Sequence, residues 1–230
     1  MDQPGESFFQ VSDECRSLGL RAGAILFRDL TIGDSPPALR EQIDELSRQI
    51  GDEFQTAAEI RESAEIKAHY EILRRVGVKP RRRPPSTEKL LDLARTRQTL
   101  PAINSLVDAY NLVSIASRCS LGAHDLDLFD SPAELRLFRG DEQFRPLGSE
   151  EDQPITAGEF GYVDAENRVL CRLDSLQADF SKVTPATKNV LLIVEATDQH
   201  EPEQIAAAFE ETIALVSEFC GGTSEVVAQP

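Results

Sequence analysis

The segment from Asn189 to Ala196 constrains the fold more than any other part of the chain. Its centre, Val190–Val194, is the longest uninterrupted aliphatic run in the sequence. A run of this length is typical of a strand buried inside a sheet. It is far shorter than the roughly 20 residues that a membrane-spanning helix needs. We therefore expect a globular protein built around this strand, with no membrane partner.

Helical periodicity dominates the chain to about residue 120, and period-two alternation follows it. Helices are expected to begin near Pro37, Ala57, Ser86, Pro101 and Pro202. Strands are expected near 8–11, 20–30, 135–138, 160–163 and 168–173. The pattern predicts a mixed α+β fold, with a mostly antiparallel sheet packed by helices. We predict one domain over 1–222, closed by a helix at 202–220, and a frayed tail at 223–230.

Motifs that carry cofactor or metal chemistry are missing from the sequence. It has no phosphate-binding glycine loop, no HExxH, no nucleophile elbow and no CxxC pair. The four cysteines are widely scattered, which favours reduced thiols and a cytoplasmic location. No N-terminal segment has the pattern of a signal peptide. We predict no metal and no cofactor.

Charge is distributed unevenly along the chain. The net charge of −16 argues against a protein that wraps DNA. Between residues 79 and 100, however, seven basic residues face only two acidic ones. This strip either docks one polyanion or forms a solvated linker and helix face. If it binds tRNA phosphate, the candidate residues are Lys79, Arg81, Arg82, Arg83, Arg95 and Arg97.

Polar residues interrupt the apolar helical pattern between Leu100 and Leu128. Asp108 and Asn111 are three residues apart and share a helix face, where they either brace a neighbouring loop or form a site. His124 in the following turn is either a hydrogen-bonded turn residue or a reactive one. The carboxylates after it either cap the turn or hold a hard cation; they are Asp125, Asp127 and Asp130.

Four blocks in fixed order carry a resemblance to a known family. They read LPAINSLVDAYNLVS, LGAHDLD, ELRLFRGDEQF and VTPATKNVLLIVEA. Together they resemble the tRNA-binding and editing domain of the phenylalanyl-tRNA synthetase β subunit, and in particular its free-standing relatives. The resemblance implies a mixed α/β fold around a buried amino-acid pocket, with tRNA or aminoacyl-tRNA as the partner. It also implies hydrolysis of mischarged aminoacyl-tRNA.

The functional positions of that family fall on changed residues here. The family's Asp-x-Thr-Asn segment matches 108–111, with Tyr110 in place of the threonine. Its histidine position is Gly122, and its aromatic position is His124. Its pocket glutamate falls on Asp179, and the glycine pair before it on 177–178. The fold signature is therefore better preserved than the pocket.

The resemblance supplies the candidate site. It predicts Asp179 and His124 as catalytic residues. The predicted substrate-binding residues are Asn111, Gly122, Thr184, Thr187 and Asn189. Asp179 could instead form a salt bridge with Arg172 or Lys182, and the polar residues at 184–189 could simply satisfy a turn.

Three functions remain open from the sequence. The chain could be an aminoacyl-tRNA deacylase that acts in trans. It could be a non-catalytic RNA-binding module, or a protein that binds a small, amino-acid-like molecule in the same pocket. The sequence does not determine the oligomeric state.

Overall fold

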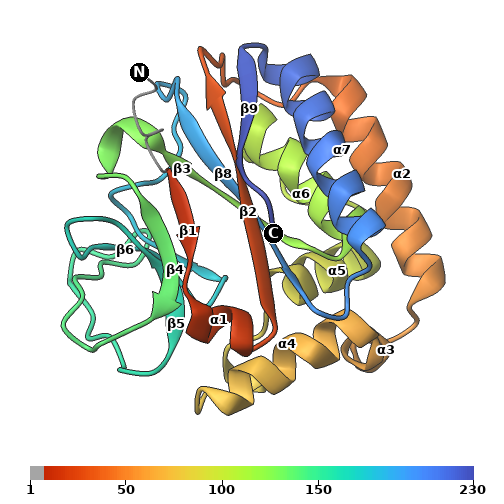
Figure 1. The fold of residues 1–230 in the computed structure, drawn as a ribbon. Coiled ribbons are helices and arrows are strands. Elements are labelled where there is room, and N and C mark those ends of the chain that lie inside the picture. The colour runs from red at the N-terminus through yellow and green to blue at the C-terminus, as the bar shows by residue number, and fades with distance from the viewer. Residues whose placement is uncertain (1–7) are drawn as a thin grey trace.

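The chain folds into three layers, as Figure 1 shows for a computed structural model that describes residues 8–230. A four-stranded sheet lies in the middle, with helices on one face and a five-stranded sheet on the other. This arrangement confirms the predicted α+β class with antiparallel sheets packed by helices. The predicted extent of the domain, 1–222, stays a prediction, and its first seven residues lie outside the described part.

The central sheet is built on the predicted apolar strand, β8 (Val190–Thr197). Its strand order is β3-β8-β2-β9, with β2 at Leu20–Arg28 and β3 at Ser120–Asp125. Every residue of β8 is buried. Val190 and Leu192 pack against the helices, whereas Leu191 and Ile193 pack against the second sheet. The alternation follows from the two-residue period of a strand.

The second sheet has the order β1-β4-β5-β6-β7. Its strands are β1 (Phe9–Val11), β4 (Ala133–Leu137), β5 (Phe160–Val163), β6 (Val169–Arg172) and β7 (Leu176–Gln177). β1 and β4 are parallel, and the remaining pairs are antiparallel. Residues from both sheets form one hydrophobic cluster, so the facing sides of the two sheets enclose a shared core.

Two groups of helices cover the central sheet. The outer face is covered by α2 (Pro37–Glu53), α6 (Ser105–Ser117) and α7 (Pro202–Cys220). At one end of the sheets lie α3 (Ala57–Glu62), α4 (Ala64–Arg75) and α5 (Ser86–Arg97), as Figure 1 shows. Short turns of helix occur at α1 (Asp13–Ser17), η1 (Pro80–Arg82) and η2 (Leu126–Leu128). Among the described residues, no helix combines the length and the apolar character needed to cross a bilayer.

The prediction of a frayed tail was wrong. Residues 223–228 form β9 (Thr223–Ala228), which pairs antiparallel with the edge of β2. An edge strand leaves a row of backbone N–H and C=O groups that need partners. The tail supplies those partners immediately after α7, although most of its side chains are exposed. Backbone pairing, rather than side-chain burial, orders this segment.

Two helix boundaries also differ from the predicted ones. The single helix expected to begin near Ala57 is divided at Ser63, which has extended backbone angles and stands at the N-cap position of α4. The helix expected from Pro101 begins at Ser105, because Asn104 is its N-cap and accepts a hydrogen bond from the Val107 amide at 2.9 Å. A side-chain cap fixed that helix start more strongly than the proline did.

Candidate functional site

A small polar cavity lies between the two sheets. On β3, Ser120, Gly122 and His124 line it, while Ala123 between them packs in the core on the helix side. On β8, Glu195 follows Leu191 and Ile193 at two-residue spacing and faces the same way. The cavity has a volume of about 20 Å³, which is enough for roughly one water molecule. Its lining is completed by Leu121, Tyr162, Cys171, Asp174 and Ile193.

Glu195 is a carboxyl group buried among apolar strand residues. It is 3% exposed. The Tyr162 hydroxyl donates a hydrogen bond to Oε2, and Oε1 has no partner among the described residues. Burial raises the pKa of Glu195 to about 8, and the nearby Asp174 carboxylate adds to this effect. Glu195 therefore stays largely protonated at neutral pH.

Asp174 reaches the cavity from the turn between β6 and β7. Leu173 and Asp174 both have positive φ angles, 56° and 60°, as a tight hairpin turn requires. One carboxylate oxygen, Oδ2, accepts hydrogen bonds from the Ser86 amide at 3.0 Å and from the Ser120 hydroxyl at 2.9 Å. The Ser86 hydroxyl donates to it at 3.1 Å. The other oxygen, Oδ1, is buried without a hydrogen bond from any described residue.

His69 on α4 completes a group of three ionisable side chains. Its Nε2 atom lies 3.7 Å from Asp174 Oδ1, outside hydrogen-bond distance. Within the described chain, Nε2 has no hydrogen-bond partner. One ligand atom each from His69, Asp174 and Glu195 lies within 4.8 Å of the other two. Buried polar atoms without partners are rare in folded proteins, because each loses its hydration. Three in one place indicate a functional site.

His124 and Gly122, two of the predicted site residues, both line this cavity. The ring Nδ1 of His124 lies 3.1 Å from the Ser181 hydroxyl. Burial lowers the pKa of His124 to about 4, so the ring is neutral at pH 7. A Cβ atom added to Gly122 would meet no heavy atom within 4 Å. The glycine therefore leaves open space at the position where the resemblance expects a histidine.

Asp179, the other predicted catalytic residue, is not in this cavity. It lines a separate surface hollow together with Phe144 and Arg145. Its Oδ1 accepts hydrogen bonds from the Lys182 ammonium at 2.9 Å and the Gly148 amide at 3.1 Å. These bonds lower the pKa of Asp179. The structure thus does not bring Asp179 and His124 together; the alternative salt bridge with Lys182 is the one that forms.

The predicted substrate-binding residues before β8 brace a turn. The Thr187 hydroxyl donates to Asp125 at 2.6 Å, and the Thr184 amide donates to the Thr187 hydroxyl at 3.0 Å. The Asn189 side chain donates to Asp127 at 3.0 Å. None of these residues lines the inter-sheet cavity. The carboxylates at 125–127 therefore act as caps of the turn, which was one of the two open interpretations.

The polar face of α6 lies on the other side of the central sheet. Asp108 accepts hydrogen bonds from Ser35 at 2.6 Å, Arg40 at 3.0 Å and the Ile103 amide at 3.1 Å. It ties the loop after β2 and the segment before α6 together. Asn111 lies one helical turn further on, nearly buried, and does not line the cavity. The bracing interpretation holds for Asp108.

The predicted phosphate-binding residues divide into two groups. Lys79, Arg81, Arg82 and Arg83 are exposed on and around η1, and Arg97 is exposed at the end of α5. Arg95 is instead held within the fold, since it donates to Asp92 at 2.7 Å and to the Gln55 carbonyl at 3.2 Å. We call residues 79–83 the cationic segment. It precedes Ser86, whose amide and hydroxyl hold Asp174.

Sequence reasoning missed three residues of the site, and only one had a usable signal. Glu195 is a lone charge in the apolar alternation of β8, on the face of Leu191 and Ile193. That parity could have identified it. His69 lies on a helix and Asp174 in a turn, far apart in the chain, and no local pattern connects them.

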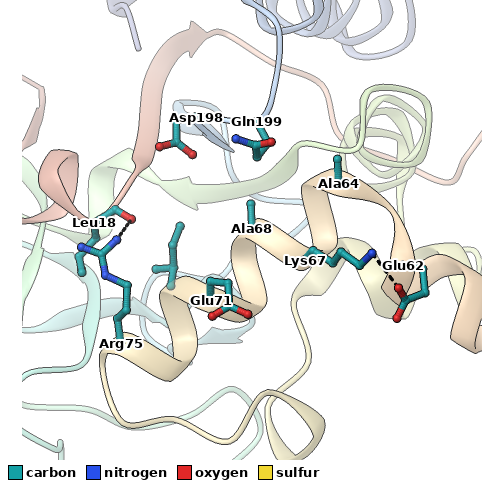
Figure 2. A pocket seen from close by; sticks show the side chains of 10 residues that line it. Leu18, Glu62, Ala64, Lys67, Ala68, Glu71, Arg75, Asp198 and Gln199 are labelled. Atoms are coloured by element: carbon teal, nitrogen blue, oxygen red, sulfur yellow. Dashed lines mark hydrogen bonds and ion pairs between the residues drawn. The ribbon is translucent and has the colours of Figure 1, made fainter.

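A second hollow, drawn in Figure 2, lies between α4 and the loop after β8. Two of its cationic groups bind within the protein. Lys67 pairs with Glu62 at 2.7 Å, and Arg75 donates to the Leu18 carbonyl at 3.0 Å. It lacks the unpaired buried atoms of the inter-sheet cavity. We therefore place the candidate site between the sheets.

Comparisons with known proteins agree with this fold. Residues 68–221 match the family model of the B3/4 domain, a range that contains His69, Asp174 and Glu195. The phenylalanine–tRNA ligase β subunit of Methanococcus vannielii is 30% identical over 112 residues, which cover 40% of this chain and 20% of that protein.

A solved structure gives the same picture of the fold. The crystal structure of an N-terminal fragment of the phenylalanyl-tRNA synthetase β subunit from Pyrococcus horikoshii matches with a TM-score of 0.50 at 13% sequence identity. The match covers 94% of this chain and 50% of that fragment. The chain thus spans half or less of the length of these relatives.

Proposed function

The chain belongs to the B3/4 domain family, and on that premise we propose that it binds tRNA and hydrolyses mischarged aminoacyl-tRNA in trans. The observation that carries this proposal is the buried cluster of Glu195, Asp174 and His69 beside the cationic segment. The relatives named above are tRNA ligase subunits by name. A tRNA ester is therefore the substrate class that this cluster would act on.

The cationic segment is suited to hold the end of the RNA. Its arginines at 81–83 are exposed, and arginine binds phosphate through paired N–H groups. Two residues, Pro84 and Pro85, separate Arg83 from Ser86, so the two positions are at most about 10 Å apart when the chain is extended. Because Ser86 holds Asp174, phosphates bound by the segment would bring the aminoacyl end to the mouth of the cavity.

The chemistry needs one water molecule and a polarised ester. The water oxygen attacks the ester carbonyl carbon, the bond from that carbon to the ribose oxygen breaks, and the proton passes to the ribose oxygen. The products are the free amino acid and the uncharged tRNA. Asp174 and Glu195 would orient the water, since each has one oxygen without a partner in the described structure. The space beside Gly122 would admit part of the amino acid.

Deacylation of a panel of mischarged tRNAs tests this proposal. We expect release of at least one amino acid above the buffer rate. Glu195→Gln and Asp174→Asn should each reduce this rate by about 100-fold, as expected when a group that positions the reacting water is lost. Glu210→Gln, an exposed residue of α7, should have no effect. Release of no amino acid across a broad panel would contradict the proposal.

Asp179→Asn distinguishes the two candidate sites. It should leave release unchanged if the inter-sheet cavity is the site, because Asp179 lies at a separate hollow. Loss of release in Asp179→Asn, with normal rates in Glu195→Gln, would instead support the site expected from the resemblance.

RNA binding without hydrolysis is the second candidate, because the cavity is small. A volume of about 20 Å³ does not hold an amino-acid side chain as it stands. This candidate is supported if the protein binds uncharged and aminoacylated tRNA equally and releases no amino acid from any of them.

A further inference from the structure

We propose that His69, Asp174 and Glu195 form a binding site for one divalent transition-metal ion, with Zn²⁺ as the best fit. Each residue contributes one atom: His69 Nε2, Asp174 Oδ1 and Glu195 Oε1. These three atoms lack hydrogen-bond partners among the described residues, and one ligand atom of each residue lies within 4.8 Å of the other two. One cation would satisfy all three.

The three side chains are buried, and one ligand atom of each lies within 4.8 Å of the other two. His69 is 5% exposed, Glu195 is 3% exposed, and the Asp174 side chain is 2% exposed. An exposed acidic cluster is solvated and needs no cation. Buried carboxylates have lost that hydration and must be neutralised, paired or bound to a metal.

Surrounding residues hold each carboxylate so that one oxygen stays available. Ser86 and Ser120 occupy Asp174 Oδ2, at 3.1 and 2.9 Å from their hydroxyls. Tyr162 occupies Glu195 Oε2. Hydrogen bonds to the second oxygen of a ligating carboxylate are a regular feature of metal sites, because they orient the ligand.

The donor set selects the class of ion. One imidazole nitrogen with two carboxylate oxygens suits Zn²⁺ or Mn²⁺ better than Mg²⁺ or Ca²⁺, which prefer oxygen alone. Zn²⁺ binds such ligands at about 2.0–2.2 Å, so its ligand atoms lie about 3.3 Å apart. His69 and Asp174 are already at 3.7 Å.

Metal binding does not depend on the proposed deacylation. A role of the metal in ester hydrolysis does depend on it. Three protein ligands leave a coordination position for water, and a bound Zn²⁺ makes that water a stronger nucleophile near pH 7. The possible contribution to ester hydrolysis therefore rests on the proposed function. The binding itself rests only on the positions of the three side chains.

Titration of the metal-free protein tests the site. The full chain is treated with EDTA, dialysed, and titrated with Zn²⁺ by calorimetry and with Co²⁺ by visible absorption. We expect one equivalent to bind, the Co²⁺ complex to show d–d absorption bands, and Zn²⁺ to raise the melting temperature. Mg²⁺ at the same concentration should have little effect.

Variants locate the binding. His69→Gln and Glu195→Gln should weaken Zn²⁺ binding by at least about 100-fold, more than the loss of a supporting residue usually does. Asp130→Asn removes an exposed carboxylate paired with Arg168 and should bind normally. Circular dichroism shows whether each ligand variant folds. If one does not fold, the stoichiometry and the Co²⁺ spectrum of the wild type still decide whether the protein binds one metal ion. Absence of stoichiometric binding, or unchanged binding in folded ligand variants, would overturn the proposal.

Deacylation assays on EDTA-treated protein separate this inference from the proposed function. Release that persists without metal, in a protein that binds no Zn²⁺, refutes the metal site and leaves the deacylase standing. Stoichiometric Zn²⁺ binding with no release from any tRNA refutes the deacylase and leaves the metal site standing.

Discussion

At Glu195, a carboxyl group lies in the interior of the protein between two sheets. Its neighbours on the same face of β8 are Leu191 and Ile193, and its only described hydrogen bond is from Tyr162. Burying such a group lowers stability unless hydrogen bonds, an ion pair or a metal replace the lost hydration. The fold tolerates this cost at the point where Asp174 and His69 also converge. Several unfavourable burials of polar groups at one position in the fold are typical of a functional site.

Asp108 shows the opposite case, a buried carboxylate whose role is structural. Asp108→Ala should lower the free energy of unfolding by about 1–3 kcal/mol, because it leaves partly buried donors on Ser35, Arg40 and the Ile103 amide without this acceptor. Urea unfolding measures this change. Deacylation per folded molecule should stay normal. A normal unfolding curve with lost activity would instead make Asp108 a site residue.

His124 should make stability depend on pH in the acid range. Burial lowers its pKa to about 4 in the folded protein, compared with about 6.5 in an unfolded chain. The unfolded chain therefore binds this proton more readily. Stability from this group is complete above about pH 6.5 and is lost as the pH falls towards 4. The loss amounts to about 3 kcal/mol.

The comparison with His124→Gln isolates this effect. Burial lowers the pKa of His200 too, and that contribution is present in both proteins. The free energy of unfolding of wild type should therefore fall more steeply than that of the variant between pH 6.5 and 4. Parallel pH profiles would show that His124 does not titrate as a buried neutral ring.

At the scale of a strand, two glycines should respond differently to the same substitution. In β5, a Cβ on Gly161 would lie 2.4 Å from the Phe138 ring and 2.4 Å from the Cys171 carbonyl oxygen. Gly161→Ala should destabilise the protein by about 1–3 kcal/mol, as overpacking does. In β3, Gly122→Ala meets nothing within 4 Å and should change stability by less than about 0.5 kcal/mol.

Thermal or urea unfolding of the two variants decides this prediction. Equal losses would mean that the space beside Gly122 is filled in solution. A neutral Gly122→Ala would also make a larger side chain at this position a direct probe of the cavity, because it would enter the space between the sheets.

The elements that sequence patterns predicted well are those whose own residues carry the signal. β8 is continuously apolar, and α7 has a regular buried stripe between Pro202 and Gly221. β9 has no such signal, since its residues are mostly exposed. It is a strand because β2 offers an edge to pair with, and no local window contains that edge.

At the scale of the whole molecule, a cationic segment stands out on an acidic protein of net charge −16. Replacing Arg81, Arg82 and Arg83 with glutamate should abolish tRNA binding at low salt. It should leave the melting temperature nearly unchanged, because all three side chains are exposed. Arg48→Glu, on the exposed face of α2, should bind normally.

The salt dependence of binding gives an independent measurement. Each phosphate contact adds about 0.7 to 0.9 to the slope of log affinity against log salt. Single reversals at 81, 82 or 83 should each reduce the slope by about that amount. An unchanged slope would place the RNA on another surface.

The sequence by itself determined the α+β class of this protein and the resemblance that led to its family, but it predicted one sheet where the structure has two. Apolar periodicity and turn residues are properties of short segments. A helix or strand that packs on a core needs an apolar face, so its own sequence carries that pattern. The sequence also predicted two residues of β3 that line the cavity, Gly122 and His124. It did not show that Asp179 and His124 line different hollows, because a motif does not determine the path of the loop that carries it.

The tertiary structure alone decided the chemistry of the candidate site. His69, Asp174 and Glu195 come from a helix, a hairpin turn and a central strand that are widely separated in the chain. They meet because the two sheets pack face to face and α4 closes one end of the sheets. These groups lose their hydration only because of that packing, which leaves one polar atom of each without a partner among the described residues.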